Sequence, residues 1–352
     1  MRRGLHGVAL SEGWARVRAE GRKLGGWTIH GGRLSEARQV YGDAPLPWLD
    51  LSTGINPQPW PGADSIPIDW RALPDETELR ELEAAAAAYF GVAADRLCAL
   101  PGTEIGLRLL DGLGLPAPAH FVSPGYRTHG EAFEGGSAVE RGGLSDAMDG
   151  GTVLLANPNN PDGHIFAADA LLQLAARAAV AGGWLVVDES FADACPEVSL
   201  AQHVEESMPV LVLRSFGKFF GLAGVRLGFA IGPEPMIGAL RRKLGSWPVS
   251  SAALRIGSAA YRDAHWISET RSRLAFHAVA LDTMLCRHGF EPIGDCPLFR
   301  LIDAGDGAAL FDRLARRGIL TRPFDYAPRW LRLGLPGSDE ALARLDRALA
   351  DG

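Results

Sequence analysis

Five short apolar runs, separated by longer segments of helix-forming composition, constrain the fold of this chain more than any other feature of its sequence. Continuous runs rich in Val and Leu are typical of strands that are covered on both faces. The intervening segments, such as "AADALLQLAARAAVAGG", favour helix. The alternation predicts an α/β fold with a mostly parallel sheet covered by helices. The runs occupy residues 120–123, 152–157, 184–189, 209–215 and 227–232.

A second, smaller domain is expected because the 352 residues exceed what a single core usually accommodates. After about residue 233 the alternation gives way to longer helical segments, of which residues 268–290 form the longest. The short runs "LFRLID" and "WLRLGLP" follow. This change of pattern predicts a smaller α+β domain.

Charge and composition exclude several classes of function. The formal net charge is -7 and the isoelectric point is about 5.7, which argues against a nucleic-acid or anionic-membrane partner. No stretch reaches the roughly 18 apolar residues of a membrane helix. The cysteines form no CxxC pair and do not cluster with histidines, so we expect no metal site, no disulfide framework and a cytoplasmic protein. They are Cys98, Cys195, Cys286 and Cys296.

Lys218 stands in the run "SFGKFFGLAGVRLGF" (215–229), between glycine and two phenylalanines. A lysine in such surroundings loses hydration, which favours the neutral amine that attacks a carbonyl to form a Schiff base. The alternative is a surface lysine whose aliphatic stem covers apolar neighbours.

Two further polar residues follow apolar runs. Asp188 closes a fully apolar run, and a buried carboxylate there needs a positive partner such as a pyridinium nitrogen. A helix cap or an ordinary ion pair is the alternative. Asn160 lies in "NPNNPDG", a loop rigid enough to direct an amide at a phenolate oxygen, although a simple surface turn has the same composition.

A phosphate site is indicated by "GTE" at residues 102–104, where a helix is expected to begin. Unpaired N–H groups and the helix dipole attract phosphate there. Ser215 and Arg226 supply a hydroxyl and a guanidinium for the same group. An N-cap preceded by a glycine hinge is the alternative interpretation.

Taken together, "NPNNPDG", "VVDESF", "SFGKFFGLAGVRLGF" and "WLRLGLP" resemble the fold-type I pyridoxal-phosphate enzymes, the aspartate aminotransferase superfamily. The resemblance covers roughly residues 28–350. It implies that Lys218 carries the cofactor and that Asp188 and Asn160 contact the pyridine nitrogen and the ring hydroxyl. Tyr126 would stack on the ring. The phosphate would be bound by Gly102, Thr103, Glu104, Ser215 and Arg226.

Within the superfamily, "HGG" (30–32) and "DLSTGINPQPWP" (50–61) resemble the threonine-phosphate decarboxylases of cobalamin synthesis. The position three residues after Asp188 is also similar to these decarboxylases. It is Phe191 in this chain, whereas most related aminotransferases have a tyrosine there. The resemblance implies decarboxylation of L-threonine O-3-phosphate to aminopropanol phosphate by a homodimer. Arg332 would bind the substrate α-carboxylate. The other expected substrate residues are His30, Gly31, Gly32, Asn56 and Arg322.

The resemblance also implies a division of the chain. We predict an extension of unassigned role at residues 1–27 and a segment at 28–60 that contributes to the active site and the small domain. A large cofactor-binding domain would span 61–245 and a small C-terminal domain 246–352.

Two residues depart from the family pattern. Leu73 replaces the tyrosine that reaches the neighbouring subunit's cofactor phosphate, and Asp162 replaces the threonine of the asparagine loop. Two other functions stay open. One is an aminotransferase acting on histidinol phosphate or a related amino acid, and the other is a non-catalytic protein that binds the cofactor or a partner.

Overall fold

The computed structural model describes residues 24–350, which form two compact units. One unit contains residues 55–278 and 294–298, and we call it the sheet unit. The other contains the described residues up to Gly54 together with 279–293 and 299–350, and we call it the terminal unit. The part of the predicted extension at residues 1–23 lies outside the described residues. The predicted domain boundaries stay predictions.

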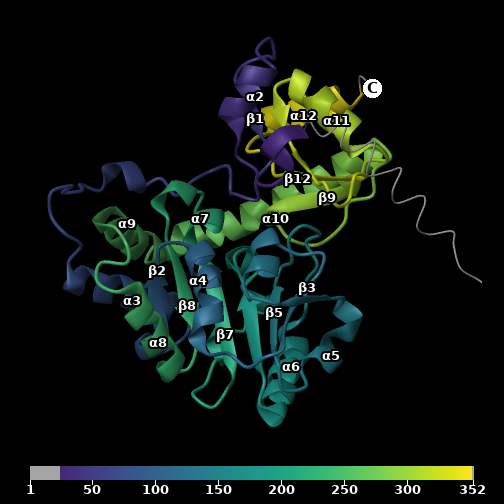
Figure 1. Ribbon diagram of the computed structural model, residues 1–352. Helices are drawn as coiled ribbons and strands as arrows, with labels where there is room; N and C mark the ends of the chain where they lie inside the picture. Colours follow the sequence, from purple (N-terminus) through teal and green to yellow (C-terminus); the bar gives the residue numbers. More distant parts are fainter. Residues whose placement is uncertain (1–23, 351–352) are drawn as a thin grey trace, which may run out of the picture. The chain divides into compact units, whose positions relative to one another are not determined.

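A seven-stranded sheet organises the sheet unit (Figure 1). The strand order is β2-β8-β7-β6-β5-β3-β4. The strands are β2 (Leu97–Leu100), β3 (Ala119–Val122), β4 (Ser137–Val139), β5 (Thr152–Ala156), β6 (Trp184–Asp188), β7 (Val210–Ser215) and β8 (Gly228–Ile231). All neighbours pair in parallel except β2 with β8 and β8 with β7, which are antiparallel. The predicted α/β fold is confirmed.

All five predicted apolar runs are strands. The residues of β5 are all buried, as are those of β7 and β8, which agrees with a sheet covered on both faces. The helices of this unit are α3 (Glu76–Phe90), α4 (Thr103–Leu109), α5 (Leu144–Ala147), α6 (Ala168–Ala181), α7 (Phe216–Phe219), α8 (Glu234–Leu244) and α9 (Ser251–Tyr261). Helix α3 and the predicted helix α6 end at Gly91 and Gly182, both in the left-handed conformation that glycine adopts without strain.

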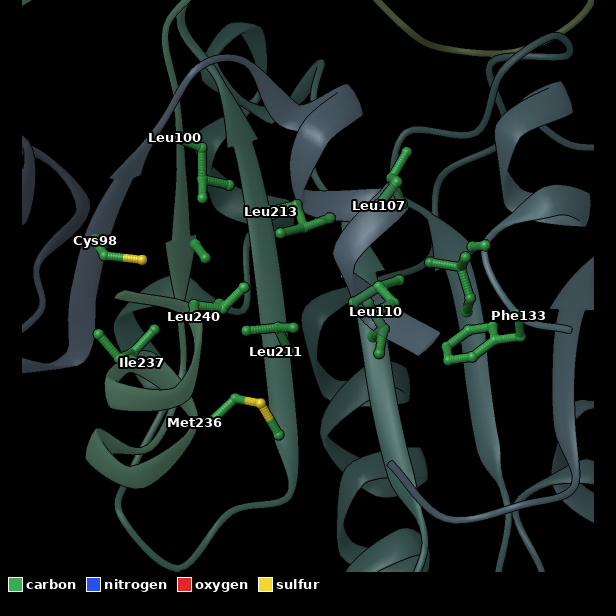
Figure 2. Close-up of a cluster of buried hydrophobic side chains, with 14 residues drawn as sticks. Cys98, Leu100, Leu107, Leu110, Phe133, Leu211, Leu213, Met236, Ile237 and Leu240 are labelled. Carbon is green, nitrogen blue, oxygen red and sulfur yellow. The ribbon is translucent and has the colours of Figure 1, made fainter. Parts of the chain in front are cut away.

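One face of the sheet is covered by α4 and α8. Figure 2 shows Leu107 and Leu110 from the region of α4, and Met236, Ile237 and Leu240 from α8, in one cluster with side chains of the strands. Helix α4 begins at the predicted site residue Thr103, so burial of its side chains also fixes the loop that carries Gly102.

The terminal unit contains a three-stranded antiparallel sheet in the order β11-β12-β9 and a parallel pair, β1 with β10. Trp27 is buried in its core, with ring centroids 5.3 Å from Phe311 and 6.0 Å from Tyr41. The strands are β1 (Leu49–Asp50), β9 (Phe299–Asp303), β10 (Ile319–Leu320), β11 (Arg322–Pro323) and β12 (Trp330–Gly334). The helices are α2 (Leu34–Val40), α11 (Gly307–Arg316) and α12 (Asp339–Ala350), and α10 (Ala264–Arg287) contributes residues to both units.

Candidate active site

One edge of the seven-stranded sheet gathers the predicted cofactor-binding residues. The parallel strands β6 and β7 end there at Asp188 and Ser215. Ser215 is paired with Gly228, the first residue of the antiparallel strand β8, so Arg226 lies just before the same edge. A Cβ on Gly228 would lie 2.8 Å from the backbone N of Thr103, which places the start of α4 against this strand.

Asp188 is almost completely buried and its carboxylate is held by short contacts. Oδ1 accepts hydrogen bonds from the backbone N and the hydroxyl of Ser190, at 3.0 and 2.5 Å. Oδ2 lies 3.1 Å from Nε2 of the buried His129. Burial alone would raise the pKa of Asp188, but the contacts with His129 and Ser190 hold this pKa below its ordinary value. The carboxylate is therefore ionised in a buried position.

Lys218 lies in α7, directly after β7, and is less buried than its aromatic neighbours. Phe216 stacks on Phe220 with ring centroids 4.5 Å apart, and Phe219 packs edge-on against Trp266. Residues three and four apart share one side of a helix, so the rings of Phe216, Phe219 and Phe220 anchor α7 together. The phenylalanines therefore position the lysine, whereas the sequence interpretation gave them the role of removing water from its amine.

Tyr126 and Glu104 are joined by a hydrogen bond. The Tyr126 hydroxyl donates to Oε2 of Glu104 at 3.1 Å, and the Thr128 hydroxyl contacts both oxygens of the same carboxylate. Arg108 donates to Oε1 at 3.0 Å. Burial raises the pKa of Tyr126 to about 12. Because the Glu104 side chain is occupied in this way, only its backbone N–H is suited to the predicted phosphate contact.

The predicted phosphate residues surround Gly102. Its backbone has φ 90° and ψ 152°, and a Cβ there would lie 2.6 Å from Nη2 of Arg226. The Arg226 guanidinium is exposed and thus lies beside the first residues of α4. Ser215 is 7% exposed at the end of the neighbouring strand. Glycine is needed at position 102 both for its backbone conformation and for the approach of this guanidinium.

The asparagine loop is held by the neighbours of Asn160. The Asn159 amide donates to the carbonyl of Pro124 at 3.0 Å and to Asp162 Oδ1 at 2.8 Å. Asp162 is buried and accepts from Arg141 Nη1 at 2.6 Å. The charge of Asp162 is thus paired with Arg141, which lies in the segment after β4, while Asn160 stays partly exposed.

Five of the predicted substrate residues lie in the terminal unit. Arg322 on β11 and Arg332 on β12 are directly opposite each other in the antiparallel pair, so both side chains lie on one face. Nη2 of Arg322 donates to the carbonyl of Ile29 at 2.6 Å, next to His30. Nη2 of Arg332 donates to the carbonyl of Ser52 at 3.1 Å.

Ser52 also connects Arg332 to the two glycines. Its hydroxyl accepts from the Gly32 backbone N at 2.8 Å and donates to Asp50 at 2.5 Å. A Cβ on Gly31 would overlap the Ser52 carbonyl. The structure therefore brings the segment 30–32 and both arginines together.

Asn56, the sixth predicted substrate residue, lies in the sheet unit and contacts the lysine segment. Its backbone N donates to the carbonyl of Lys218 at 2.9 Å. Its side-chain amide donates to the carbonyl of Phe219 at 2.9 Å and accepts from the Gln58 backbone N. These contacts hold α7, and a substrate contact of Asn56 stays a prediction.

Sequence reasoning missed three residues that hold the predicted ones, namely His129, Ser190 and Ser52. His129 follows Tyr126 by three residues and has no pattern of its own. Ser190 and Ser52 each follow an acidic residue by two positions, a spacing at which a serine N–H and hydroxyl reach the carboxylate, and this was the available signal.

Comparisons with known proteins identify the family of this chain. A model of the family Aminotransferase class I and II matches residues 143–349, and the chain belongs to this family. It is 44% identical over 329 residues to a threonine-phosphate decarboxylase of Pseudomonas aeruginosa, covering 91% of this chain and 96% of that protein. It is 40% identical to a threonine-phosphate decarboxylase of a Sinorhizobium species, covering 92% and 97%.

Among solved structures, the fold is similar to histidinol-phosphate aminotransferase from Sinorhizobium meliloti in complex with pyridoxal-5'-phosphate. The TM-score is 0.78 at 21% sequence identity, covering 90% of this chain and 93% of that one. The predicted membership of the aspartate aminotransferase superfamily is confirmed.

Two further findings concern the described residues alone. No group of three His, Cys, Asp or Glu side chains in residues 24–350 is placed to bind a metal. No helix in this range combines the length and apolar character needed to span a membrane.

Proposed function

We propose that this chain is a pyridoxal-phosphate-dependent decarboxylase of L-threonine O-3-phosphate that produces aminopropanol phosphate for cobalamin synthesis. The observation that carries the proposal is the pair of arginines directly opposite each other on β11 and β12. Threonine phosphate presents two anionic groups, a carboxylate and a phosphate. The two decarboxylases that resemble most of the chain support the same substrate.

Asp188 suits the pyridine nitrogen of the cofactor. It is buried and ionised, and within residues 24–350 its only ion-pair contact is with His129. A protonated ring nitrogen would add a second positive partner for this buried carboxylate. Asn160 is the proposed partner of the ring hydroxyl, since Phe191 has no hydroxyl to offer.

The space beside Gly102 suits the cofactor phosphate. Arg226 supplies a guanidinium there, Ser215 supplies a hydroxyl, and the backbone N–H groups of Thr103 and Glu104 complete the donor set. Lys218 is the proposed point of covalent attachment. When bound, pyridoxal phosphate supplies an electron sink for the pair of electrons left at the substrate Cα.

The protein's own residues choose which bond breaks. Arg332 binds the substrate α-carboxylate through its planar guanidinium, and Arg322 with residues 30–32 binds the substrate phosphate. Fixing both ends of a small substrate sets the direction of the bond from Cα to the carboxylate. Lys218, which the substrate amine would displace from the cofactor, would then be free to return a proton from Nζ to Cα after carbon dioxide leaves.

Three substrates test the proposal. The cofactor-loaded protein should release carbon dioxide and form aminopropanol phosphate from threonine phosphate, and should act weakly on serine phosphate and histidinol phosphate. Conversion of the cofactor to its amine form by histidinol phosphate, without carbon dioxide release from threonine phosphate, would instead identify an aminotransferase. Binding of the cofactor without turnover of any substrate would identify the non-catalytic alternative.

We also propose a homodimer in the cytoplasm. The exposed side chains of Trp70 and Leu73, at 78% and 66%, are apolar surface that a second copy of the chain can cover. Leu73 has no hydroxyl, so the contact made by the family tyrosine is absent in this proposal. All four cysteines are free, which agrees with a reducing compartment. Light scattering during size-exclusion chromatography measures the mass directly, and a monomer would contradict the dimer.

A further inference from the structure

At the ends of β6 and β7, two residues that are adjacent in the sequence point to opposite faces of the sheet. Asp188 and Ser215 face the candidate cofactor site. Successive side chains of a strand alternate between faces, so Glu189 and Arg214 face the other way. The backbone ladder continues through Glu189, whose N–H donates to the carbonyl of Leu213 at 2.8 Å. The side chains of Glu189 and Arg214 thus lie on the face of the sheet opposite to Asp188 and Ser215.

Glu189, Arg214 and Asp193 form a buried cluster. Nη1 of Arg214 donates to Glu189 Oε2 at 2.7 Å and to the Ser199 hydroxyl at 2.8 Å, while Nη2 donates to Asp193. The three charged residues are 0 to 2% exposed. One guanidinium therefore joins the end of β7 to the end of β6 and to the turn that follows β6.

The surroundings fix each member of the cluster. Glu189 Oε1 accepts from the Leu200 backbone N at 2.6 Å, and the carbonyl of Asp193 accepts from Arg271 Nε at 2.9 Å. The Arg214 guanidinium lies 4.6 Å from the ring centre of Phe90. Burial alone would lower the pKa of Arg214, but Asp193 and Glu189 raise it above its ordinary value. The guanidinium stays charged and cannot relax toward solvent.

We propose that Arg214 is a positioning residue that sets the distance between Asp188 and the segment from Ser215 to Lys218. Ser215 directly follows Arg214 and precedes α7, so a shift of Arg214 moves the phosphate contact and the lysine together. Through Glu189 the same guanidinium fixes the end of β6 and so the position of Asp188, the residue that would contact the ring nitrogen. The proposal rests on the proposed function only in that pyridoxal phosphate is the cofactor, and it concerns cofactor binding rather than substrate choice.

A matched pair of glutamates separates positioning from ordinary stabilisation. Glu83 is also buried, accepts a backbone N–H from Ala99 at 3.0 Å and accepts from Arg241 Nη2 at 2.7 Å. It lies on α3 and takes no part in the proposed cofactor site. Replacing either glutamate by glutamine keeps the shape of the side chain and removes the charge that faces the arginine.

The test compares Glu189→Gln with Glu83→Gln. The measurements are the melting temperature, the dissociation constant of pyridoxal phosphate, and the pH midpoint of the visible absorbance of the cofactor-loaded protein. We expect both variants to melt at lower temperature. Only Glu189→Gln should bind the cofactor at least about ten-fold more weakly and shift the pH midpoint by half a unit or more.

Arg214→Lys provides a second variant that keeps the charge. A lysine donates from one nitrogen and cannot hold both carboxylates in the geometry of the guanidinium. We expect the affinity for pyridoxal phosphate and the pH midpoint of the absorbance to change in the same direction as in Glu189→Gln. The proposal would be overturned if a folded Glu189→Gln or Arg214→Lys variant had the wild-type affinity for pyridoxal phosphate and the wild-type pH midpoint. It would also be overturned if neither of these variants folded while Glu83→Gln did. A wild-type protein that does not bind pyridoxal phosphate would overturn the proposed function instead.

Discussion

The glycine before α4 offers a sharp test of the proposed phosphate site. Gly102 has φ 90° and ψ 152°, a region that is open essentially to glycine alone. In Gly102→Ala the new Cβ would lie 2.6 Å from Nη2 of Arg226. The exposed arginine can move, so we expect the variant to fold with its guanidinium displaced from the start of α4.

Two effects with different magnitudes should follow. The backbone strain costs about 1–3 kcal/mol of stability. A hydrogen bond to a charged group contributes about 1.5–3 kcal/mol. Because Arg226 is exposed, we take the lower end, which corresponds to roughly ten-fold weaker binding of pyridoxal phosphate.

Gly245 supplies the control. It has φ 70° and ψ -159°, a comparable glycine-only conformation, and a Cβ there would have nothing within 4 Å. Gly245→Ala should lose a similar amount of stability in urea unfolding and bind pyridoxal phosphate like the wild type. The double variant Gly102→Ala/Arg226→Ala should bind pyridoxal phosphate no more weakly than Arg226→Ala alone, because the two substitutions remove the same contact. Equal cofactor affinity in Gly102→Ala and Gly245→Ala would refute the role of Arg226.

Three other predictions concern the residues that hold the site. Ser52→Ala removes the acceptor of the Gly32 N–H, so the KM for threonine phosphate should rise several-fold while the affinity for pyridoxal phosphate, measured by absorbance titration, stays unchanged. The pKa of Asp188 is lowered in the folded chain, so its ionised form adds stability above about pH 4 that is lost as the pH falls through the lowered value. Urea unfolding of the cofactor-free protein from pH 6 to 3 should therefore show a steeper loss of stability in the wild type than in Asp188→Asn. Asp162→Asn weakens the buried contact with Arg141 and should cost about 1–3 kcal/mol in the same unfolding assay, with an unchanged free energy counting against a role for that pair.

Five of the seven strands of the large sheet, and its mostly parallel order, could be predicted from the sequence, but the reversed direction of β8 could not. The apolar runs of β7 and β8 have similar composition, yet β8 runs antiparallel to its neighbours. Apolar content records burial on both faces and carries no information about direction. The edge strand β4 was missed because its residues Ser137–Val139 are short and largely exposed.

The residues of the candidate site could be named from sequence motifs. The contacts that hold these residues in place could not be predicted from the sequence. Lys218, Asp188 and Arg226 could be named because each belongs to a motif with a chemical purpose. His129 could not, because a single histidine that is distant in the chain from Asp188 becomes its neighbour only when β6 and the loop after β3 meet. Contacts of this kind depend on the fold and leave no local pattern.

The motif around Lys218 combines a residue of proposed function with neighbours that anchor its helix. The phenylalanines beside the lysine suggested an apolar environment for the amine, and in the structure their rings pack on one another and on Trp266 and so anchor α7. The same division recurs at Asp188, where Glu189 turns away and binds Arg214. In each case the residue next to the reactive one anchors it. Sequence neighbours share a motif without sharing an environment, because strand and helix geometry point them in different directions. Which side faces the cofactor is decided by the packing of distant segments, so the anchoring role of these neighbours emerges only from the fold.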